Sequence, residues 1–153
     1  MPASRYAATI TGLISVFQTA APAVTVFDGL TIGDDSLTEA IIVGASSDFE
    51  ATDAGTFTQE YRTTGGASAA KDETVTIPCA VIVDSGDTSV AAARARCCEI
   101  LALLEDGLRA NYSLGLAPNV MWADLQSCTF TSEQSPYGES FRADFTITIQ
   151  SVI

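Results

Sequence analysis

Strict alternation of apolar and polar residues predicts two long β-strands in this chain. Residues 72–84 place five apolar side chains on one face, at Val75, Ile77, Cys79, Val81 and Val83. Residues 139–153 repeat the pattern with Phe141, Ala143, Phe145, Ile147 and Ile149. A period of two is typical of strands that bury one face. The second strand is longer than a compact domain needs, so we expect it to bend or to reach a neighbouring subunit.

Two other segments repeat their apolar residues at helical spacing. After a turn at residues 85–86, Asp87 or Thr88 is expected to cap a helix that runs to about Ala110. Its buried stripe is expected to hold Val90, Ala93, Cys97, Ile100, Leu101, Leu104 and Leu108. At 1.5 Å per residue this helix is a rod of about 34 Å, long enough to cross a sheet. Residues 4–20 predict a second, N-terminal helix that ends before Pro22.

Four further strands complete a single domain that is expected to span residues 1–153. We expect them at residues 24–27, 39–43, 56–63 and 120–132, the last with an irregularity before Phe130. A type I turn is expected at residues 135–138, where proline and glycine hold the typical positions. Short connections between successive strands favour antiparallel pairing. The predicted fold is therefore α+β, a mostly antiparallel sheet with the N-terminal helix and the long central helix packed on one face.

A glycine-rich segment at residues 64–71 separates the third strand from the long fourth one. If these two strands pair antiparallel, the segment is the tip of a long hairpin that projects from the body. An ordinary surface loop is the alternative. The segment continues into a strand instead of a helix, so it does not match a phosphate-binding loop.

The charge of the chain disfavours partners that carry negative charge. Nineteen acidic residues against seven basic ones give a net charge of −12. Such a chain repels nucleic-acid backbones and anionic membranes. Apolar residues make up 47% of the sequence, but no apolar run approaches the length of a membrane span. The N-terminal segment is interrupted by polar residues, so we interpret it as a folded helix, with a secretory signal as the alternative.

The residue types argue against an enzyme and against a resident cofactor. The chain has no histidine, which excludes Ser-His and Cys-His nucleophilic arrangements. Adjacent carboxylates at residues 34–35 and 105–106 suit solvated surfaces, and the acidic loops lack the spacing of an EF-hand. The four cysteines form no CxxC pair, and Cys97 and Cys98 point about 100° apart on a helix, a poor geometry for zinc. We expect buried free thiols in a reducing compartment.

The order of these segments resembles the tail terminator proteins of bacteriophages with long, non-contractile tails. The resemblance covers nearly the whole chain and begins with the amphipathic helix followed by VTVFDG, AIIVG and FTQEY. It continues through VTIPCAVIVDSGD and its Ala/Arg-rich helix to the EQSPYG turn and the terminal strand FRADFTITIQSVI. Each motif is weakly specific, and order and spacing carry the resemblance. Leu30 departs from the family, whose members often have proline after the Asp-Gly turn.

The resemblance implies a structural virion protein, assembled in the host cytoplasm, that works without a cofactor, a metal or a membrane. Such proteins form a homohexameric ring at the head-proximal end of the tail tube, stop tail assembly there and provide head–tail joining to neck proteins. Phage DNA passes through the lumen without specific binding. Candidate ring or tube contacts are Thr64, Gly65, Gly66, Ala67, Ser68, Lys71, Tyr137, Arg142, Gln150 and Ile153. Alternatives are another head–tail connector or head-completion protein, and a small non-catalytic ligand-binding or adaptor domain.

Overall fold

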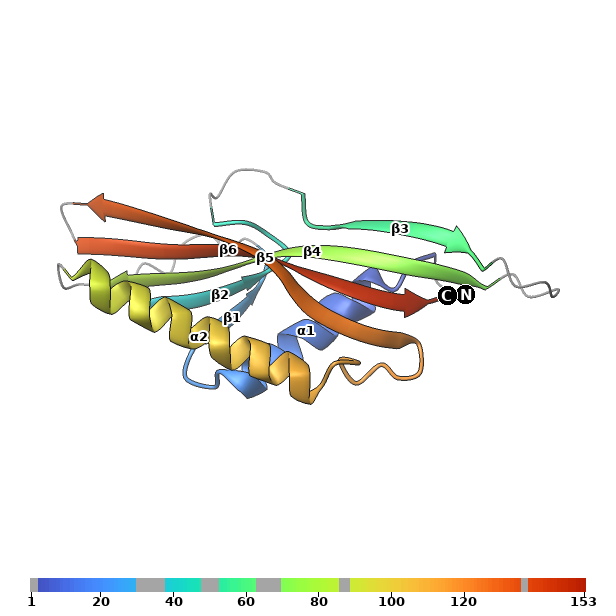
Figure 1. Cartoon of the computed structure of the whole chain (residues 1–153). Coiled ribbons are helices and arrows are strands. Elements are labelled where there is room, and N and C mark those ends of the chain that lie inside the picture. The colour runs from blue at the N-terminus through green and yellow to red at the C-terminus, as the bar shows by residue number, and fades with distance from the viewer. Residues whose placement is uncertain (1–2, 30–37, 48–52, 63–69, 86–88, 136–137) are drawn as a thin grey trace.

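The computed structural model describes residues 3–29, 38–47, 53–62, 70–85, 89–135 and 138–153, and all structural statements below concern these residues (Figure 1). In chain order the elements are α1 (Tyr6–Ala20), β1 (Thr25–Asp28), β2 (Glu39–Val43), β3 (Thr56–Tyr61), β4 (Lys71–Ser85), α2 (Val90–Ala110), β5 (Val120–Ser135) and β6 (Gly138–Val152). The two alternating stretches form β4 and β6, and the two helical stretches form α2 and α1.

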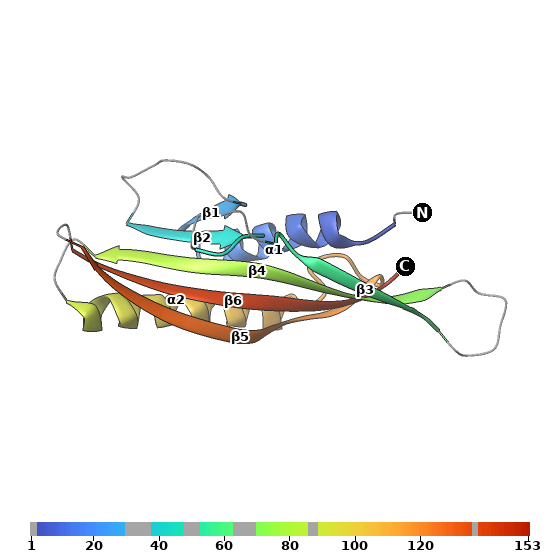
Figure 2. The ribbon, with the colours of Figure 1, turned by 90° about the horizontal axis from the view of Figure 1, so that it is seen from above.

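One sheet contains all six strands, in the order β1-β2-β4-β6-β5, with β3 paired to the remaining length of β4 (Figure 2). Among the described strands, only β1 and β2 pair in parallel; the other pairs are antiparallel. The long strands pair so that Val75 lies opposite Ile149 and Val81 lies opposite Ala143, which brings both apolar faces to the same side. A register shift between Leu125 and Ser127 is the irregularity predicted in β5. The predicted α+β class with a mostly antiparallel sheet is confirmed.

Both helices lie on one face of the sheet, as predicted (Figure 1). α2 runs along β4, β6 and β5, while α1 packs against β1 and against α2. The core between the layers is apolar and includes the fully buried side chains Leu13, Phe17, Ile41, Ile77, Ile100, Leu104, Ile147 and Ile149. Burial of one strand face and one helix stripe explains why the period-two and helical patterns were both readable in the sequence.

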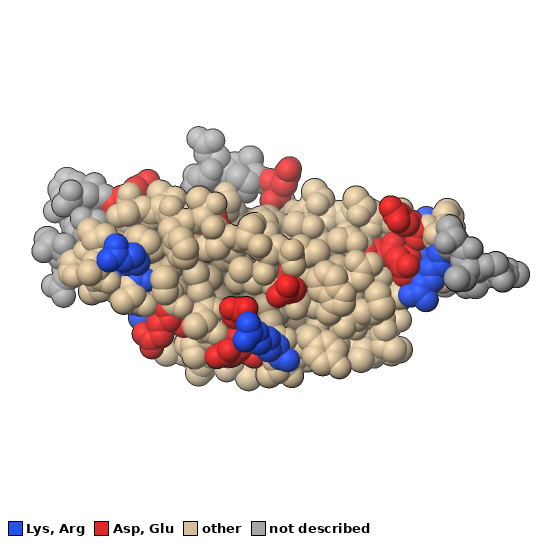
Figure 3. All heavy atoms as spheres, in the orientation of Figure 1, with Lys and Arg blue, Asp and Glu red and all other residues tan. Residues whose placement is uncertain are grey.

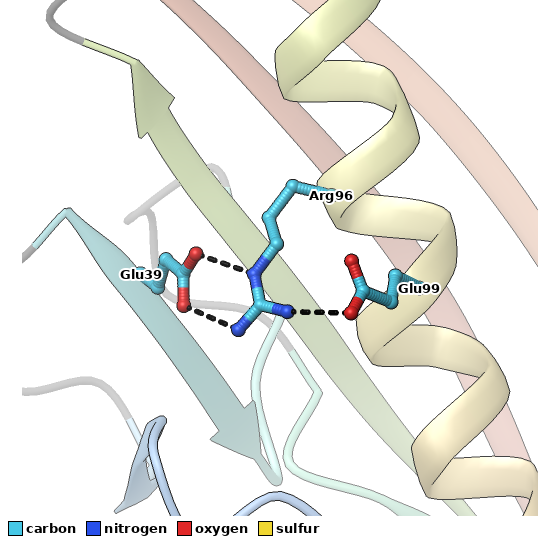
Figure 4. Close-up of polar contacts among 3 residues, drawn as sticks. All are labelled: Glu39, Arg96 and Glu99. Atoms are coloured by element: carbon cyan, nitrogen blue, oxygen red, sulfur yellow. Dashed lines mark hydrogen bonds and ion pairs between the residues drawn. The ribbon is translucent and has the colours of Figure 1, made fainter.

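α2 begins at a different cap than the sequence suggested. Ser89, and not Asp87 or Thr88, is the N-cap, because its backbone is extended and its Oγ accepts a hydrogen bond from the backbone N–H of Ala92 at 3.2 Å. Farther along, Arg96 donates two hydrogen bonds to Glu39 of β2, at 2.6 and 3.0 Å, and contacts Glu99 at 3.2 Å (Figure 4). The bidentate contact fixes α2 against the β2 side of the sheet.

α1 is held at two points. Near its end, Ala20 lies against Gly107 of α2 so closely that a Cβ on Gly107 would approach the Ala20 Cβ to 2.7 Å. At its start, the backbone N–H of Arg5, the N-cap residue, donates to Oε1 of Glu73 at 2.7 Å. Glu73 is fully buried in β4 and also accepts from Nε2 of Gln59 at 2.8 Å and from Ser151 Oγ at 3.3 Å. A buried carboxylate therefore joins α1 to β3, β4 and β6.

Within the part of the chain that the structure describes, no helix lies on the other face of the sheet, as the view in Figure 2 shows. Residues 44–47 cover one part of it, where Ile42, Ala45 and Ala80 form a small second apolar cluster. Ser47 fixes this segment, because its N–H and hydroxyl both donate to the Asp144 carboxylate at 2.8 Å. The remaining open face is lined by hydroxyl side chains, among them Thr74, Thr76, Thr146 and Thr148.

Candidate assembly interface

Six of the ten predicted contact residues lie outside the described part of the chain: Thr64, Gly65, Gly66, Ala67, Ser68 and Tyr137. The strands on either side of the first five are described, and they pair antiparallel from Thr56 opposite Thr76 to Tyr61 opposite Lys71. The backbone N–H of Arg62 donates to the carbonyl of Ala70 at 3.2 Å and extends this pairing. The contact role of all six residues stays a prediction.

Lys71 and Ile153 lie beside each other at one end of the sheet. Their backbones exchange two hydrogen bonds, at 3.2 Å and 3.0 Å. The Lys71 ammonium lies 4.7 Å from the centre of the Tyr61 ring, a cation–π distance. Figure 1 places both ends of the chain near this region. Lys71 is thus partly engaged within its own subunit, while Tyr61 remains 66% exposed.

Arg142 and Gln150 project from β6 onto the open face, and neighbouring groups bind both. Arg142 donates to the carbonyl of Ser47 at 3.0 Å and pairs with Glu133 of β5. Its Nε has no partner among the described residues, and its side chain is 13% exposed. The Gln150 side-chain oxygen accepts a hydrogen bond from Thr74 at 2.9 Å. These two side chains organise the open face of the subunit, and their predicted contact role is untested.

Besides the four-residue β1, the described sheet has two longer edge strands, β3 and β5. β5 pairs with β6 on one side, and along the described chain no strand pairs with its other side. β3 likewise pairs with β4 alone. β6, the terminal strand expected to bend or to reach a neighbouring subunit, pairs along its length with β4 and β5 within its own subunit. Backbone groups available to another chain therefore lie on β3 and β5 and not on β6.

Large apolar side chains are exposed mainly on these same two edge strands. Of the seven described, five belong to β3 or β5: Phe57, Tyr61, Met121, Trp122 and Phe130, each between 40% and 66% exposed. Tyr61 and Trp122 both lie on the surface. Phe57 and Phe130 were not singled out, because alternation alone does not distinguish a buried face from an exposed one. Exposed aromatics of this kind are enriched at protein interfaces.

A shallow groove of about 370 Å³ adjoins the start of β5. Its walls come from the end of α2 and from β5, and its lining residues are Glu105, Leu108, Arg109, Tyr112, Trp122, Ala123 and Asp124. Arg109 and Glu105 form an ion pair of 2.9 Å on the helix side. Mixed charge and exposed aromatic rings suit contact with another protein better than enclosure of a small ligand.

Charged side chains are sparse on the face of the molecule shown in Figure 3, and its cations lie next to acidic groups except at the upper left, where a basic group stands apart. The ion pairs include Arg62 with Asp72 at 2.7 Å and Arg109 with Glu105 at 2.9 Å. Local pairing leaves no broad basic area on this face that would attract a nucleic-acid backbone. The pKa of the Arg96 guanidinium is raised above its usual value, and the largest cause is its hydrogen bonding to Glu39.

The four thiols are free. Burial raises the pKa of Cys79 and of Cys97 to about 12, and it also raises the pKa of Cys128; Cys98 is exposed. Within the described residues, no cluster of three or more His, Cys, Asp or Glu side chains could hold a metal ion. Neither described helix has the length and apolarity to cross a membrane.

Comparison with known proteins gives a likeness of fold. No protein-family model matches the chain, and no curated protein matches it in sequence. Among solved structures, the chain is similar to a component of the virion of a native gene transfer agent (GTA) particle, with a TM-score of 0.57 and 12% identity. The match covers 94% of this chain and 92% of the virion chain. At this identity the comparison establishes a shared fold over almost the full length of both chains.

Proposed function

We propose that this protein is a structural component of a phage virion, a tail terminator that forms a ring at the head-proximal end of the tail tube. In this role it ends tube polymerisation and joins the tail to the head or neck. The observation that carries the proposal is the full-length likeness in fold to a GTA virion component. The order of sequence motifs supports the more specific assignment to the terminator.

A ring made of one chain requires two different, complementary surfaces on each subunit. The described structure offers two such surfaces, since β3 and β5 lie at opposite edges of the sheet and both expose aromatic side chains. An excess of twelve negative charges suits a channel through which DNA moves without being retained. The expected partners are further copies of this chain, the tail tube protein and a neck protein.

The same likeness in fold supports another head–tail connector or head-completion protein as the second candidate. Both candidates occupy a virion and form rings, so subunit number and binding partner distinguish them. A ligand-binding or adaptor domain is a weaker alternative, because the described grooves are shallow and lie at the edges of the fold.

Native mass spectrometry across a concentration series, with negative-stain images of the same samples, tests the proposal. The expected result is a hexamer seen as a ring with an open centre that also binds the ends of purified tail tubes. A twelve-subunit ring that binds the portal side would favour the connector. A stable dimer that binds neither tube ends nor neck proteins would refute both virion assignments.

A further inference from the structure

The free edge of β5 is long, and along the described chain it lacks most of the features that normally prevent strand addition. Soluble proteins protect edge strands with proline, lysine, β-bulges, short length or a covering segment. β5 has register shifts between Val120 and Trp122 and between Leu125 and Ser127, so its regular edge extends from Ser127 to Ser135. β5 has sixteen residues, VMWADLQSCTFTSEQS, without proline or lysine and with Asp124 and Glu133 as its charged side chains. Glu133 is itself neutralised by Arg142. Such an edge is a site for another strand.

The opposite edge provides a strand that fits it. β3 has six residues, and its side chains are almost all exposed. It carries Phe57 and Tyr61, which are 49% and 66% exposed, while β5 carries Trp122 and Phe130 at 41% and 49%. The other edge element, β1, is four residues long; its apolar residues Val26 and Phe27 are half-buried, and it packs against α1.

Strand direction also agrees. β3 runs antiparallel to β4, β4 to β6, and β6 to β5, so β3 and β5 run in opposite directions within one subunit. When the sheet of a second copy continues that of the first in the same orientation, its β3 therefore lies antiparallel to β5. Antiparallel addition preserves the pattern of the rest of the sheet and gives a heterologous contact that repeats around a ring.

We infer that β3 of one copy of this chain pairs antiparallel with the free edge of β5 of the next copy, so that the sheet continues from subunit to subunit. The contact satisfies unpaired backbone groups on both edges and covers the exposed aromatics beside them. The inference rests on the proposed ring and names its subunit contact. It does not depend on whether the ring caps a tail tube or joins a neck.

Disulfide trapping tests the pairing. In a Cys98→Ser, Cys128→Ser background, Thr58→Cys protein is mixed and oxidised with one of four β5 variants: Asp124→Cys, Ser127→Cys, Thr129→Cys or Thr131→Cys. All five positions are exposed and lie on the open face of the sheet. The expected result is a cross-linked heterodimer in one or two of the mixtures and no cross-link in any variant alone.

A β5 variant that cross-links to itself overturns the inference, because it shows β5 paired with β5. Wild-type rings without any mixed cross-link overturn it too, while the ring proposal stands. Self-association absent at every concentration overturns both proposals. Rings with the cross-link that do not bind tube ends support the inference and refute the terminator function.

A surface charge provides a second, independent readout. Phe57→Lys places a charge in the inferred contact, and we expect the concentration needed for half-assembly to rise at least tenfold. Leu103→Lys is the matched control, since Leu103 is 38% exposed and belongs to α2 and to neither of the two strands in the inferred contact. Unchanged assembly of Phe57→Lys contradicts the inference.

Discussion

Replacement of Glu73 tests the argument that one buried carboxylate holds the start of α1 to the sheet. Glu73→Ala removes the acceptor of the Arg5 N–H at 2.7 Å and of the Gln59 amide at 2.8 Å. A buried donor left unsatisfied costs about 1–3 kcal/mol, and a carboxylate at a helix N-terminus contributes about 0.3–1 kcal/mol. Because Gln59 retains its bond to the carbonyl of Ala3, we expect a loss of about 3 kcal/mol in the free energy of unfolding.

Glu73→Gln separates the hydrogen bonds from the charge. The glutamine oxygen still accepts from Arg5, but its amide group meets the Gln59 donor, so we expect a loss of only ~1 kcal/mol. Glu60→Ala is the control, because Glu60 is exposed on β3 and its removal should change stability by less than ~0.5 kcal/mol.

Urea unfolding followed by circular dichroism, at concentrations where the protein is monomeric, measures all three variants. The expected order of destabilisation is Glu73→Ala, then Glu73→Gln, then Glu60→Ala. A Glu73→Ala variant within ~1 kcal/mol of wild type would refute the argument, because the two short hydrogen bonds would then contribute almost nothing.

Three further predictions follow from packing, ion pairing and thiol burial. Gly107→Ala should destabilise the protein by about 1–3 kcal/mol in urea unfolding, because the added Cβ would lie 2.7 Å from the Cβ of Ala20. The same substitution stabilises an exposed helix, so a gain of stability would contradict the close contact between α1 and α2. A double-mutant cycle of Arg96→Met and Glu39→Gln should give a coupling of about 1 kcal/mol, and no measurable coupling would show that the bidentate contact is absent in solution. With a thiol-disulfide reagent at pH 8, Cys98 should react first and the two buried thiols last, because their raised pKa of about 12 keeps them protonated; equal rates for all thiols would contradict their burial.

The elements that bury one face were predictable from sequence, and the pairing of the strands was only partly so. Period-two alternation located β4 and β6, and helical spacing located α1 and α2, because each pattern records a buried face. The local pattern of apolar residues does not show which strands, distant in the sequence, pair with each other. The parallel pair β1–β2, and the placement of β2 and β3 along the same side of β4, therefore came only from the structure.

The candidate interface was predicted least well, for a physical reason. Sequence favoured the glycine-rich segment and the terminal strand, since flexibility and excess length are visible in a sequence. Whether a strand is central or at an edge depends on partners distant in the chain, so alternation in β6 and in β5 gave no way to tell which one has a free side. Phe57 and Phe130 are exposed for the same reason, because their strands lie at the edges of the sheet.

The central position of β4 and β6 has a consequence for the order of folding. β5 and β6 follow each other directly and pair as a hairpin, whereas β4 must find β6 across the whole of α2 and β5. Closure of that long loop costs entropy before its contacts form. We therefore expect the β5–β6 hairpin and α2 to form early and the β4–β6 ladder to set the folding rate, with an overall time of about milliseconds to seconds. Until that ladder closes, the future middle of the sheet is itself an open edge, and dilute, rapid refolding should recover more protein than slow refolding at high concentration.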